Sequence, residues 1–216
     1  MRRFITFEGI EGSGKTTQIQ MLSNHFEEQG IDHVLTREPG GTPIGDQVRK
    51  LVLNPANRAM TPACELLLYS AARAQHIEQV IRPALDEGRV VLCDRFKDAT
   101  LAYQGYGRGL PLDLIASLHD LEVLSVRPDL TLLFDIEARR ALERSRSRDV
   151  SGTNDETRFE QEDLAFHVRV RDGYLELAHQ EPDRFVVLDA RGTLNEVQQR
   201  VLAAVQRFLT TRGAPD

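Results

Sequence analysis

The sequence predicts an α/β protein in which a parallel sheet of five strands is covered by helices on both faces. Short apolar runs that read as buried strands alternate with segments whose apolar residues recur at helical spacing. A glycine-rich loop joins the first strand to the first helix. Because such alternation requires crossover connections, the strands should run parallel. The five apolar runs lie at residues 3–8, 31–36, 89–94, 129–136 and 184–189.

Length and composition favour one domain, residues 1–216. The net charge of -6 argues against a protein that coats nucleic acid, because polyanion binding usually requires a basic surplus. Two cysteines, Cys64 and Cys93, are too few for a disulfide framework, and we expect both to be buried thiols in a reducing cytoplasm. Neither a signal-peptide pattern nor an apolar run near the roughly 18 residues that span a bilayer is present, so we expect no membrane partner.

The loop after the first strand matches the phosphate-binding pattern of glycine, four residues, Gly-Lys and Ser/Thr. Its glycines let successive backbone N–H groups point at phosphate oxygens, and the helix that follows adds the positive end of its dipole. Lys15 should reach the β- and γ-phosphates, and the Thr16 hydroxyl should bind Mg²⁺. Thr17 begins the helix. The loop therefore predicts a bound nucleoside triphosphate at Gly9, Ile10, Glu11, Gly12, Ser13, Gly14, Lys15 and Thr16.

The second strand, 31–36, ends in a turn-rich segment, 37–43, at the edge where parallel sheets bind their ligands. Glu38 and Pro39 lie in this segment, although loop charges are often only solvated. The next segment, 44–53, predicts a short helix that carries Arg49.

A long helix is predicted from Thr61 to about residue 88, with a kink or break at Pro83. Tyr69 and Arg73 are four residues apart, so they share one face and can present a ring and a fork of donors to a planar ligand. The alternative is a core tyrosine beside a surface arginine.

The third strand, 89–94, ends in Asp94, as a strand that supports a nucleotide-bound magnesium ion does. Beyond Arg95, three polar residues recur at separations of three and four and can contact the edges of a small ligand: Thr100, Tyr103 and Gln104. The alternating glycines at 105, 107 and 109 predict a turn.

After the fourth strand, residues 137–148 predict a helix with an arginine-rich end. The next residues, 149–155, lack apolar periodicity and read as a mobile loop, and a long helix is expected to begin at Arg158. Such a segment suggests a lid, about residues 144–160, that brings cations to the phosphoryl group. A solvated charge run is the alternative. The arginines are Arg139, Arg140, Arg144, Arg146 and Arg148.

The fifth strand, 184–189, precedes a turn that contains Arg191 and that we place near the nucleotide base by position alone. Thr193 and Glu196 form a capping box, which predicts the start of the last helix.

Taken together, the residues resemble the bacterial thymidylate kinases, transferases that phosphorylate dTMP with ATP for dTTP synthesis. Four blocks carry the resemblance, which covers nearly the whole chain. It implies a P-loop nucleoside monophosphate kinase fold, ATP as phosphoryl donor, Mg²⁺, a cytoplasmic location and a homodimer. The blocks are residues 7–17, 36–42, 94–105 and 158–162.

The resemblance also implies roles for residues around the acceptor. Arg95 would hold the dTMP phosphate with Arg49 nearby, and Glu11 would accept a hydrogen bond from the 3′-hydroxyl. Tyr103 would crowd the 2′ position and disfavour ribonucleotides, because a hydroxyl forced against its ring would lose hydration without gaining a partner. Tyr69 would stack on thymine. Arg73 would donate to O4, and the remaining base edge would meet Thr100 and Gln104.

By the same resemblance, Gly12 marks the kind of family member whose catalytic cation comes from the lid. We therefore expect the catalytic set to comprise Lys15, Glu11, Arg95, Arg146, Arg148 and Arg158, with Arg144, Thr17 and Arg191 contacting the nucleotide. This chain departs from the family pattern in two places. Thr157 stands where the family usually has Asp, and residues 151–155 look inserted.

Two other functions stay open at this point. The chain can be another P-loop kinase that acts on a different nucleotide or nucleoside, or a regulatory P-loop switch that hydrolyses nucleotide slowly and changes partners. A switch has no need of the Tyr69/Arg73 and Thr100/Tyr103/Gln104 sets.

Overall fold

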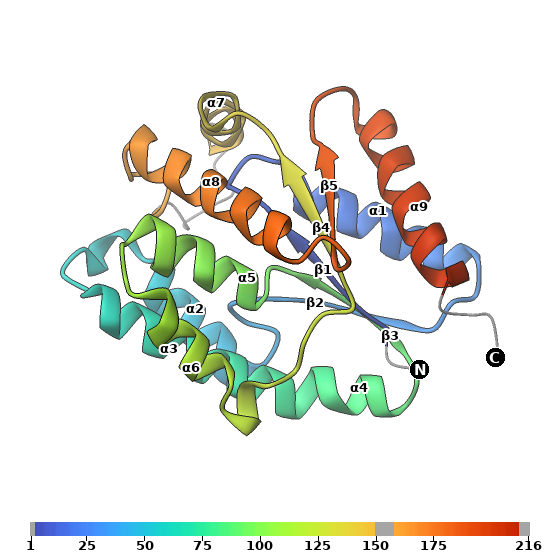
Figure 1. Ribbon diagram of the computed structural model, residues 1–216, viewed down its shortest axis with the longest axis horizontal. Coiled ribbons are helices and arrows are strands. Elements are labelled where there is room, and N and C mark those ends of the chain that lie inside the picture. Colours follow the sequence, from blue (N-terminus) through green and yellow to red (C-terminus); the bar gives the residue numbers. More distant parts are fainter. Residues whose placement is uncertain (1–2, 150–157, 212–216) are drawn as a thin grey trace.

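Five parallel strands form one sheet in the computed structural model, which describes residues 3–149 and 158–211. Their order is β2-β3-β1-β4-β5, so the strand before the phosphate loop is central, as predicted (Figure 1). The chain leaves β1 toward one edge and later returns to the other side, which creates a topological switch point at the carboxyl end of β1. The strands are β1 Arg3–Glu8, β2 His33–Arg37, β3 Val90–Asp94, β4 Leu130–Asp135 and β5 Phe185–Asp189.

Helices cover both faces of this sheet. Helices α1 and α9 pack together on one face, while α4, α5 and α8 cover the other (Figure 1). The helices are α1 Lys15–Glu28, α2 Pro43–Leu53, α3 Pro62–His76, α4 Arg82–Asp86, α5 Lys97–Thr100, α6 Leu112–His119, α7 Ala138–Asp149, α8 Leu164–Gln180 and α9 Leu194–Thr211. Short turns of 3₁₀-helix are η1 Pro55–Asn57 and η4 Glu122–Leu124, and π-helical turns are η2 Ile77–Ile81 and η3 Leu101–Gly107.

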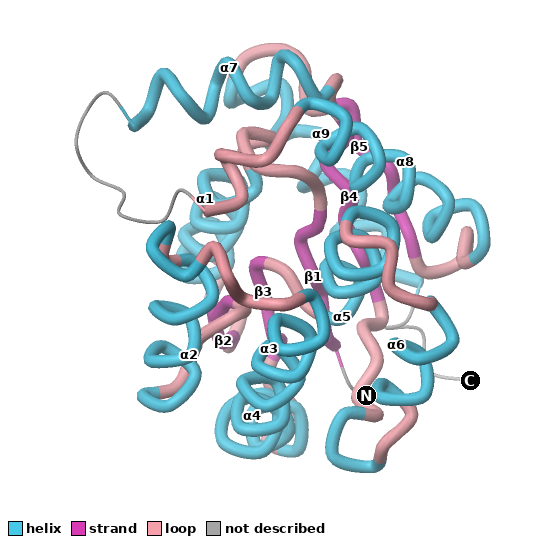
Figure 2. The backbone as a smooth tube through the Cα atoms, turned by 90° about the vertical axis from the view of Figure 1, so that its left-hand side faces the viewer, coloured by secondary structure: helices cyan, strands magenta, loops and turns pink. Residues whose placement is uncertain are grey.

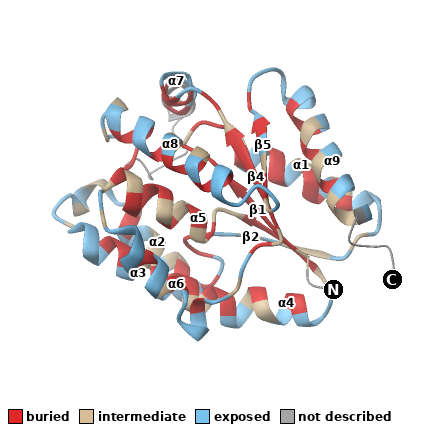
Figure 3. Ribbon diagram, in the orientation of Figure 1, coloured by how far each residue is buried: buried red, intermediate tan, exposed pale blue. Residues whose placement is uncertain are grey.

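The core follows the two-residue period of the strands. Ile5 and Phe7 of β1 pack in one apolar cluster with the inner face of α1, whereas Phe4 belongs to a second cluster with Ile77 and Phe96. Figure 3 shows the consequence: the three inner strands β3, β1 and β4 are buried, the edge strands β2 and β5 are partly exposed, and the outer faces of the helices are exposed. No helix within residues 3–149 and 158–211 is long and apolar enough to cross a membrane.

The break expected at Pro83 lies slightly earlier in the chain. Helix α3 passes into the π-helical turn η2, and Pro83 is the second residue of α4. Proline lacks an N–H and its ring clashes with the carbonyl four residues before it, and a wider turn at that point removes the clash.

Three local predictions were wrong. The glycines at 105 and 107 do not form a turn but lie inside η3, where Gly107 lets η3 approach α8: a Cβ there would lie 2.7 Å from the Phe166 ring. The helix expected from Arg158 begins at Leu164, because the Asp163 side chain accepts from the Phe166 N–H and caps it. Cys64 is exposed, since it occupies the first turn of α3; Cys93 is buried.

Candidate active site

The phosphate loop has the backbone that its sequence predicts. Gly9, Gly12 and Gly14 all have positive φ angles (137°, 75° and 93°). Lys15 lies buried inside the loop, where its Nζ donates to the Ile10 carbonyl at 2.8 Å and contacts the Ser13 hydroxyl at 3.3 Å. Burial and the neighbouring Arg95 guanidinium lower the pKa of Lys15 to about 7. Among the described residues, the Lys15 ammonium makes hydrogen bonds only to these two neutral oxygens, and the carboxylates of Asp94 and Glu11 act on it from farther away.

Thr16 and Asp94 meet at the carboxyl ends of β1 and β3. The Thr16 hydroxyl donates to Asp94 Oδ2 at 2.7 Å. Hydroxyl and carboxylate oxygens suit Mg²⁺, which usually keeps several waters and takes one or two protein ligands besides substrate phosphates. Consistent with such a sparse protein contribution, the described residues contain no cluster of three or more His, Cys, Asp or Glu side chains that could hold a metal by themselves.

Arg95 and Glu11 form the wall between the phosphate loop and the next pocket. Arg95 follows β3 with a φ of 67°, which is uncommon outside glycine. Its guanidinium donates to the Gly9 carbonyl at 3.0 Å and to Glu11 Oε1 at 3.2 Å, and it lies 4.9 Å above the Tyr103 ring. Burial would raise the pKa of the Glu11 carboxyl, but Arg95 and Lys15 outweigh it and lower that pKa to about 2. Glu11 is therefore ionised and accepts a further bond from the Tyr103 hydroxyl at 3.0 Å.

One pocket brings together the eight residues to which the resemblance gave roles around the acceptor, and also Glu38 and Pro39 of the segment after the second strand. They come from the phosphate loop, the segments after β2 and after β3, and α2, α3, α5 and η3. Leu53, Phe96, Ala99 and Phe159 complete its wall. The ten are Glu11, Glu38, Pro39, Arg49, Tyr69, Arg73, Arg95, Thr100, Tyr103 and Gln104. Their roles toward dTMP stay predictions, but their meeting around one pocket is a feature of the fold.

Arg73 lines this pocket but is almost fully buried, and its guanidinium contacts four different groups. Its Nε donates to Glu38 at 2.7 Å, and Nη2 donates to the Phe96 carbonyl and the Thr100 hydroxyl at 3.1 and 2.9 Å. Nη1 contacts His119 Nε2 at 3.2 Å. Burial and the adjacent Arg73 lower the pKa of His119 to about 3, so its ring is neutral and accepts this bond. Arg73 is thus held rigidly as a source of N–H donors.

A second depression lies on the other side of the phosphate loop. It is lined by residues of the loop, the start of α1, Arg144 of α7 and the segment after β5. Thr17 belongs to it, and Arg144 donates to the Ala190 carbonyl at 3.2 Å. Arg191, by contrast, pairs with the exposed Asp189 carboxylate at 2.8 Å and lines a separate depression. Its contact with a nucleotide stays a prediction.

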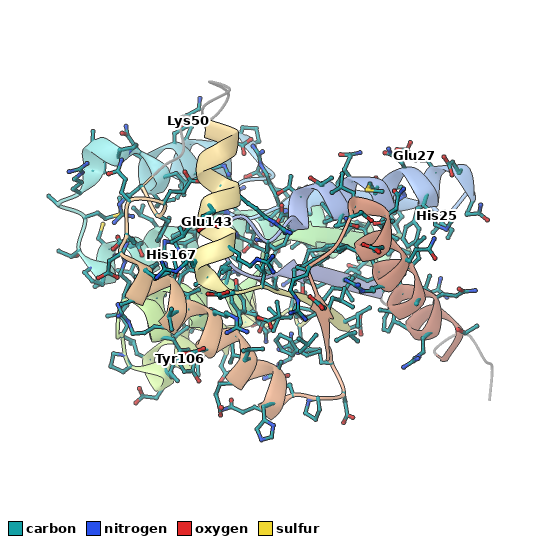
Figure 4. The ribbon with its side chains drawn as sticks, turned by 90° about the horizontal axis from the view of Figure 1, so that it is seen from above. His25, Glu27, Lys50, Tyr106, Glu143 and His167 are labelled. Carbon is teal, nitrogen blue, oxygen red and sulfur yellow. The ribbon has the colours of Figure 1, made fainter. Side chains whose placement is uncertain are left out.

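The lid arginines are placed only in part. Helix α7 lies beside the phosphate loop, with the Ala141 carbonyl against Gly12 (Figure 2). In Figure 4, which looks down on α7 at Glu143, Lys50 of α2 and Glu27 of α1 appear on opposite sides of this helix. The side chains of Arg146 and Arg148 and residues 150–157 of the predicted lid lie outside what the structure describes. Arg158 is buried and donates to Glu65 at 2.5 Å and to the Val52 carbonyl at 3.0 Å. Its catalytic role stays a prediction.

Sequence reasoning missed several buried polar residues that support the site. Glu65 of α3 accepts bonds from Gln104, Arg108 and Arg158. Glu8, at the end of β1, accepts from the Phe96 N–H and the Tyr174 hydroxyl, both at 2.7 Å. The only signal in the sequence was a charged residue inside an otherwise apolar strand or helix face. This signal does not identify the residues that bond to the charge.

Comparison with known proteins decides the family. The family model described as thymidylate kinase matches residues 7–201. A thymidylate kinase of Geobacter sulfurreducens is 57% identical over 213 residues, which cover 98% of each chain. One from Syntrophotalea carbinolica is 55% identical over 214 residues, 99% of each chain. The chain belongs to the thymidylate kinase family.

A solved structure agrees with this assignment. The crystal structure of thymidylate kinase from Ehrlichia chaffeensis superposes with a TM-score of 0.76 at 38% sequence identity, over 94% of this chain and 98% of that one. The predicted fold is thereby confirmed as that of the P-loop nucleoside monophosphate kinases. As a thymidylate kinase family member, the chain is a dTMP kinase for which the family implies ATP as the phosphoryl donor.

Proposed function

We propose that the chain transfers the γ-phosphoryl group of ATP to dTMP bound in the pocket between α3, η3 and the phosphate loop, giving dTDP and ADP. The observation that carries the proposal is the convergence of the ten expected acceptor residues on one pocket whose wall, Arg95 and Glu11, adjoins the phosphate loop. The phosphates of ATP bound in the loop and of dTMP bound in the pocket would then meet at this wall.

Binding and charge neutralisation supply most of the chemistry in this proposal. The second pKa of a phosphate monoester is about 6, so the attacking oxygen of dTMP is ionised near neutral pH and requires no general base. Arg95 orients this phosphate, Lys15 binds the transferred group, and lid arginines neutralise the charge that develops.

Mg²⁺ fits the site as a partner of ATP. Thr16 and Asp94 would hold it, directly or through water, since both present oxygens at the carboxyl end of the sheet. When bound, the ion neutralises charge on the β- and γ-phosphates. The proposal further places the enzyme in the cytoplasm, which agrees with its two free cysteines, and makes it a homodimer.

The acceptor assay tests this function directly. ADP release should be measured with ATP and, in turn, dTMP, dUMP, dCMP, dGMP and dAMP. We expect dTMP to be a much faster acceptor than dCMP, dGMP and dAMP, because Arg73 and its neighbours match the thymine edge, which only dUMP shares. Equal rates on all five would remove the assignment of the pocket to dTMP.

A further inference from the structure

Glu65 is a carboxylate of α3 with no exposed surface, and it lies behind the acceptor pocket. Its Oε1 accepts from Gln104 Nε2 at 2.8 Å and from Arg108 Nε at 3.3 Å. Its Oε2 accepts from Arg108 Nη2 at 3.3 Å and from Arg158 Nη1 at 2.5 Å. All four of these hydrogen bonds are donated by N–H groups, so the Glu65 carboxylate acts here only as an acceptor.

This arrangement gives the Gln104 amide one orientation. An amide has a donor end and an acceptor end, and only its NH₂ can face an acceptor-only partner. Oε1 of Gln104 is therefore turned away from Glu65, and within the described part of the chain no hydrogen bond to this oxygen is present. Gln104 is 1% exposed and lines the acceptor pocket. Among the described residues, this oxygen is not one of the fully enclosed side-chain atoms without a partner, so it is accessible from the pocket and can accept a donor from the ligand.

Thymine and cytosine differ at the groups that such an acceptor would meet. Thymine has an N3–H donor beside the O4 acceptor, whereas cytosine has an N3 acceptor beside the N4 amino donor. A fixed Gln104 oxygen matches thymine and leaves cytosine with two acceptors facing each other. A Gln104 amide turned the other way would have the opposite preference.

We infer that Glu65 determines the choice of thymine over cytosine by holding the Gln104 amide with its oxygen toward the base. The inference rests on the proposed binding of dTMP in this pocket. Arg73 needs no comparable control, because a guanidinium donates in every orientation and accepts in none. Without a partner, the Gln104 amide could present either its oxygen or its NH₂ to the base, and the hydrogen bond to Glu65 fixes which of the two it presents. Glu65 is a positioning residue here, since it acts on the base through Gln104.

Substitution of Glu65 by Gln should reverse the orientation of the Gln104 amide. Arg158 contacts only Oε2, so the oxygen of the new side chain should take that place and leave its NH₂ facing Gln104. Gln104 would then turn its own oxygen toward residue 65 and its NH₂ toward the base. Glu65→Asp keeps an acceptor-only carboxylate and should keep the orientation.

The test compares kcat/KM for dTMP, dUMP and 5-methyl-dCMP, the last of which differs from dTMP only along the base-pairing edge. In Glu65→Gln we expect the preference for dTMP over 5-methyl-dCMP to fall by about tenfold or more. The ratio of dTMP to dUMP should not change, because uracil presents the same N3–H and O4. Glu65→Asp should retain both ratios.

Glu162→Gln is the matched control. Glu162 accepts from the same Arg108 at 2.6 Å but has no hydrogen bond to Gln104, so its loss disturbs the arginine network alone. A purely structural Glu65 would lower activity on all acceptors equally and leave every ratio unchanged, which would overturn the inference. If the wild type itself fails to phosphorylate dTMP, the proposed function fails instead.

A measurement on the wild type covers the case in which Glu65→Gln does not fold. Breaking a buried ion pair is strongly destabilising, so a melting curve must accompany the kinetics. In ¹⁵N-labelled wild-type protein bound to dTMP, the Gln104 NH₂ protons should show nuclear Overhauser contacts to the Glu65 methylene protons. Contacts from these NH₂ protons to the N3 proton of dTMP in their place would contradict the inference.

Discussion

At the scale of single residues, Lys15 is a buried amine whose hydrogen-bond partners are uncharged oxygens. Its ammonium is buried, contacts neutral oxygens and lies near Arg95, so its pKa falls from 10.5 to about 7. The phosphates of ATP would supply the missing negative charge and favour the protonated form. Binding of ATP and protonation of Lys15 are therefore coupled.

We predict that ATP binding takes up protons between pH 7 and 10. At pH 8 the free enzyme lies above the lowered pKa of Lys15, so this amine is mostly neutral, while the complex holds it charged; uptake should approach about one proton. Titration calorimetry in buffers of different ionisation enthalpy measures this number. Lys15→Met should lose both the uptake and phosphoryl transfer with its fold intact. Equal uptake by wild type and variant would assign the proton to another group.

Arg95 combines an uncommon backbone angle with a full set of partners. A residue held at a φ of 67° costs free energy, and such strain commonly occurs at ligand sites. The carbonyl of Gly9 and the carboxylate of Glu11 aim its guanidinium along the wall of the pocket.

Arg95→Ala should raise the KM for dTMP by about ten- to hundredfold, the cost of losing charged hydrogen bonds to a phosphate. The KM for ATP should change little, since Lys15 and the loop are retained. Steady-state kinetics with each substrate varied separately checks this. Arg82→Ala, at a partly exposed arginine of α4, should alter neither value. A similar loss for both substrates would contradict the role of Arg95.

At the scale of elements, the phosphate loop and α7 are in direct contact. A Cβ on Gly12 would lie 1.9 Å from the Ala141 carbonyl oxygen, and its φ of 75° is strained for other residues. Position 12 is therefore restricted to glycine by the helix that carries the lid arginines as well as by the loop itself.

Gly12→Ala should weaken ATP binding and lower the melting temperature, because either α7 or the loop must move. The matched control is Gly88→Ala, which has a φ of 77° and open space around its Cβ. The control should lose about 1–2 kcal/mol of folding stability through its left-handed backbone, and its ATP affinity should not change. Calorimetric titration and thermal melts on both variants measure the difference. Unchanged ATP affinity in Gly12→Ala would show that the contact with α7 is not required.

At the scale of the whole molecule, the neighbouring helices α2 and α3 both expose large apolar side chains. Ile44, Leu51 and Leu67 are each more than half exposed, and the two helices pack together. Such a surface fits the homodimer that the family resemblance implies.

We expect sedimentation velocity to show a dimer that Leu67→Glu weakens or dissociates, because burying a charge without a partner is unfavourable. Val168→Glu, at an exposed position on α8, should leave the dimer intact. A monomeric wild type at micromolar concentration would refute the dimer, and a dimer insensitive to Leu67→Glu would place it on another face.

The sequence by itself was sufficient for the five strands and the central position of β1, and the family resemblance supplied most of the pocket residues. Apolar runs of fixed period and the spacing of Gly9, Gly12 and Gly14 are local properties, and each is readable from neighbouring residues. The capping box of Thr193 and Glu196 was readable for the same reason and is present. Where local signals competed, as at Gly107 and Arg158, packing against α8 and the Asp163 cap decided the outcome.

Only the tertiary structure decided which buried charges meet. Glu65, Gln104 and Arg158 are far apart in the chain, and no spacing rule connects an acidic residue of α3 with the end of the predicted lid. Their pairing depends on how α3, η3 and α8 cross, which is set by the shape of the whole core. The sequence therefore determined the phosphate loop and the fold around it. The orientation of the groups that face the acceptor followed from three-dimensional packing, because a buried donor or acceptor takes its direction from partners distant in sequence.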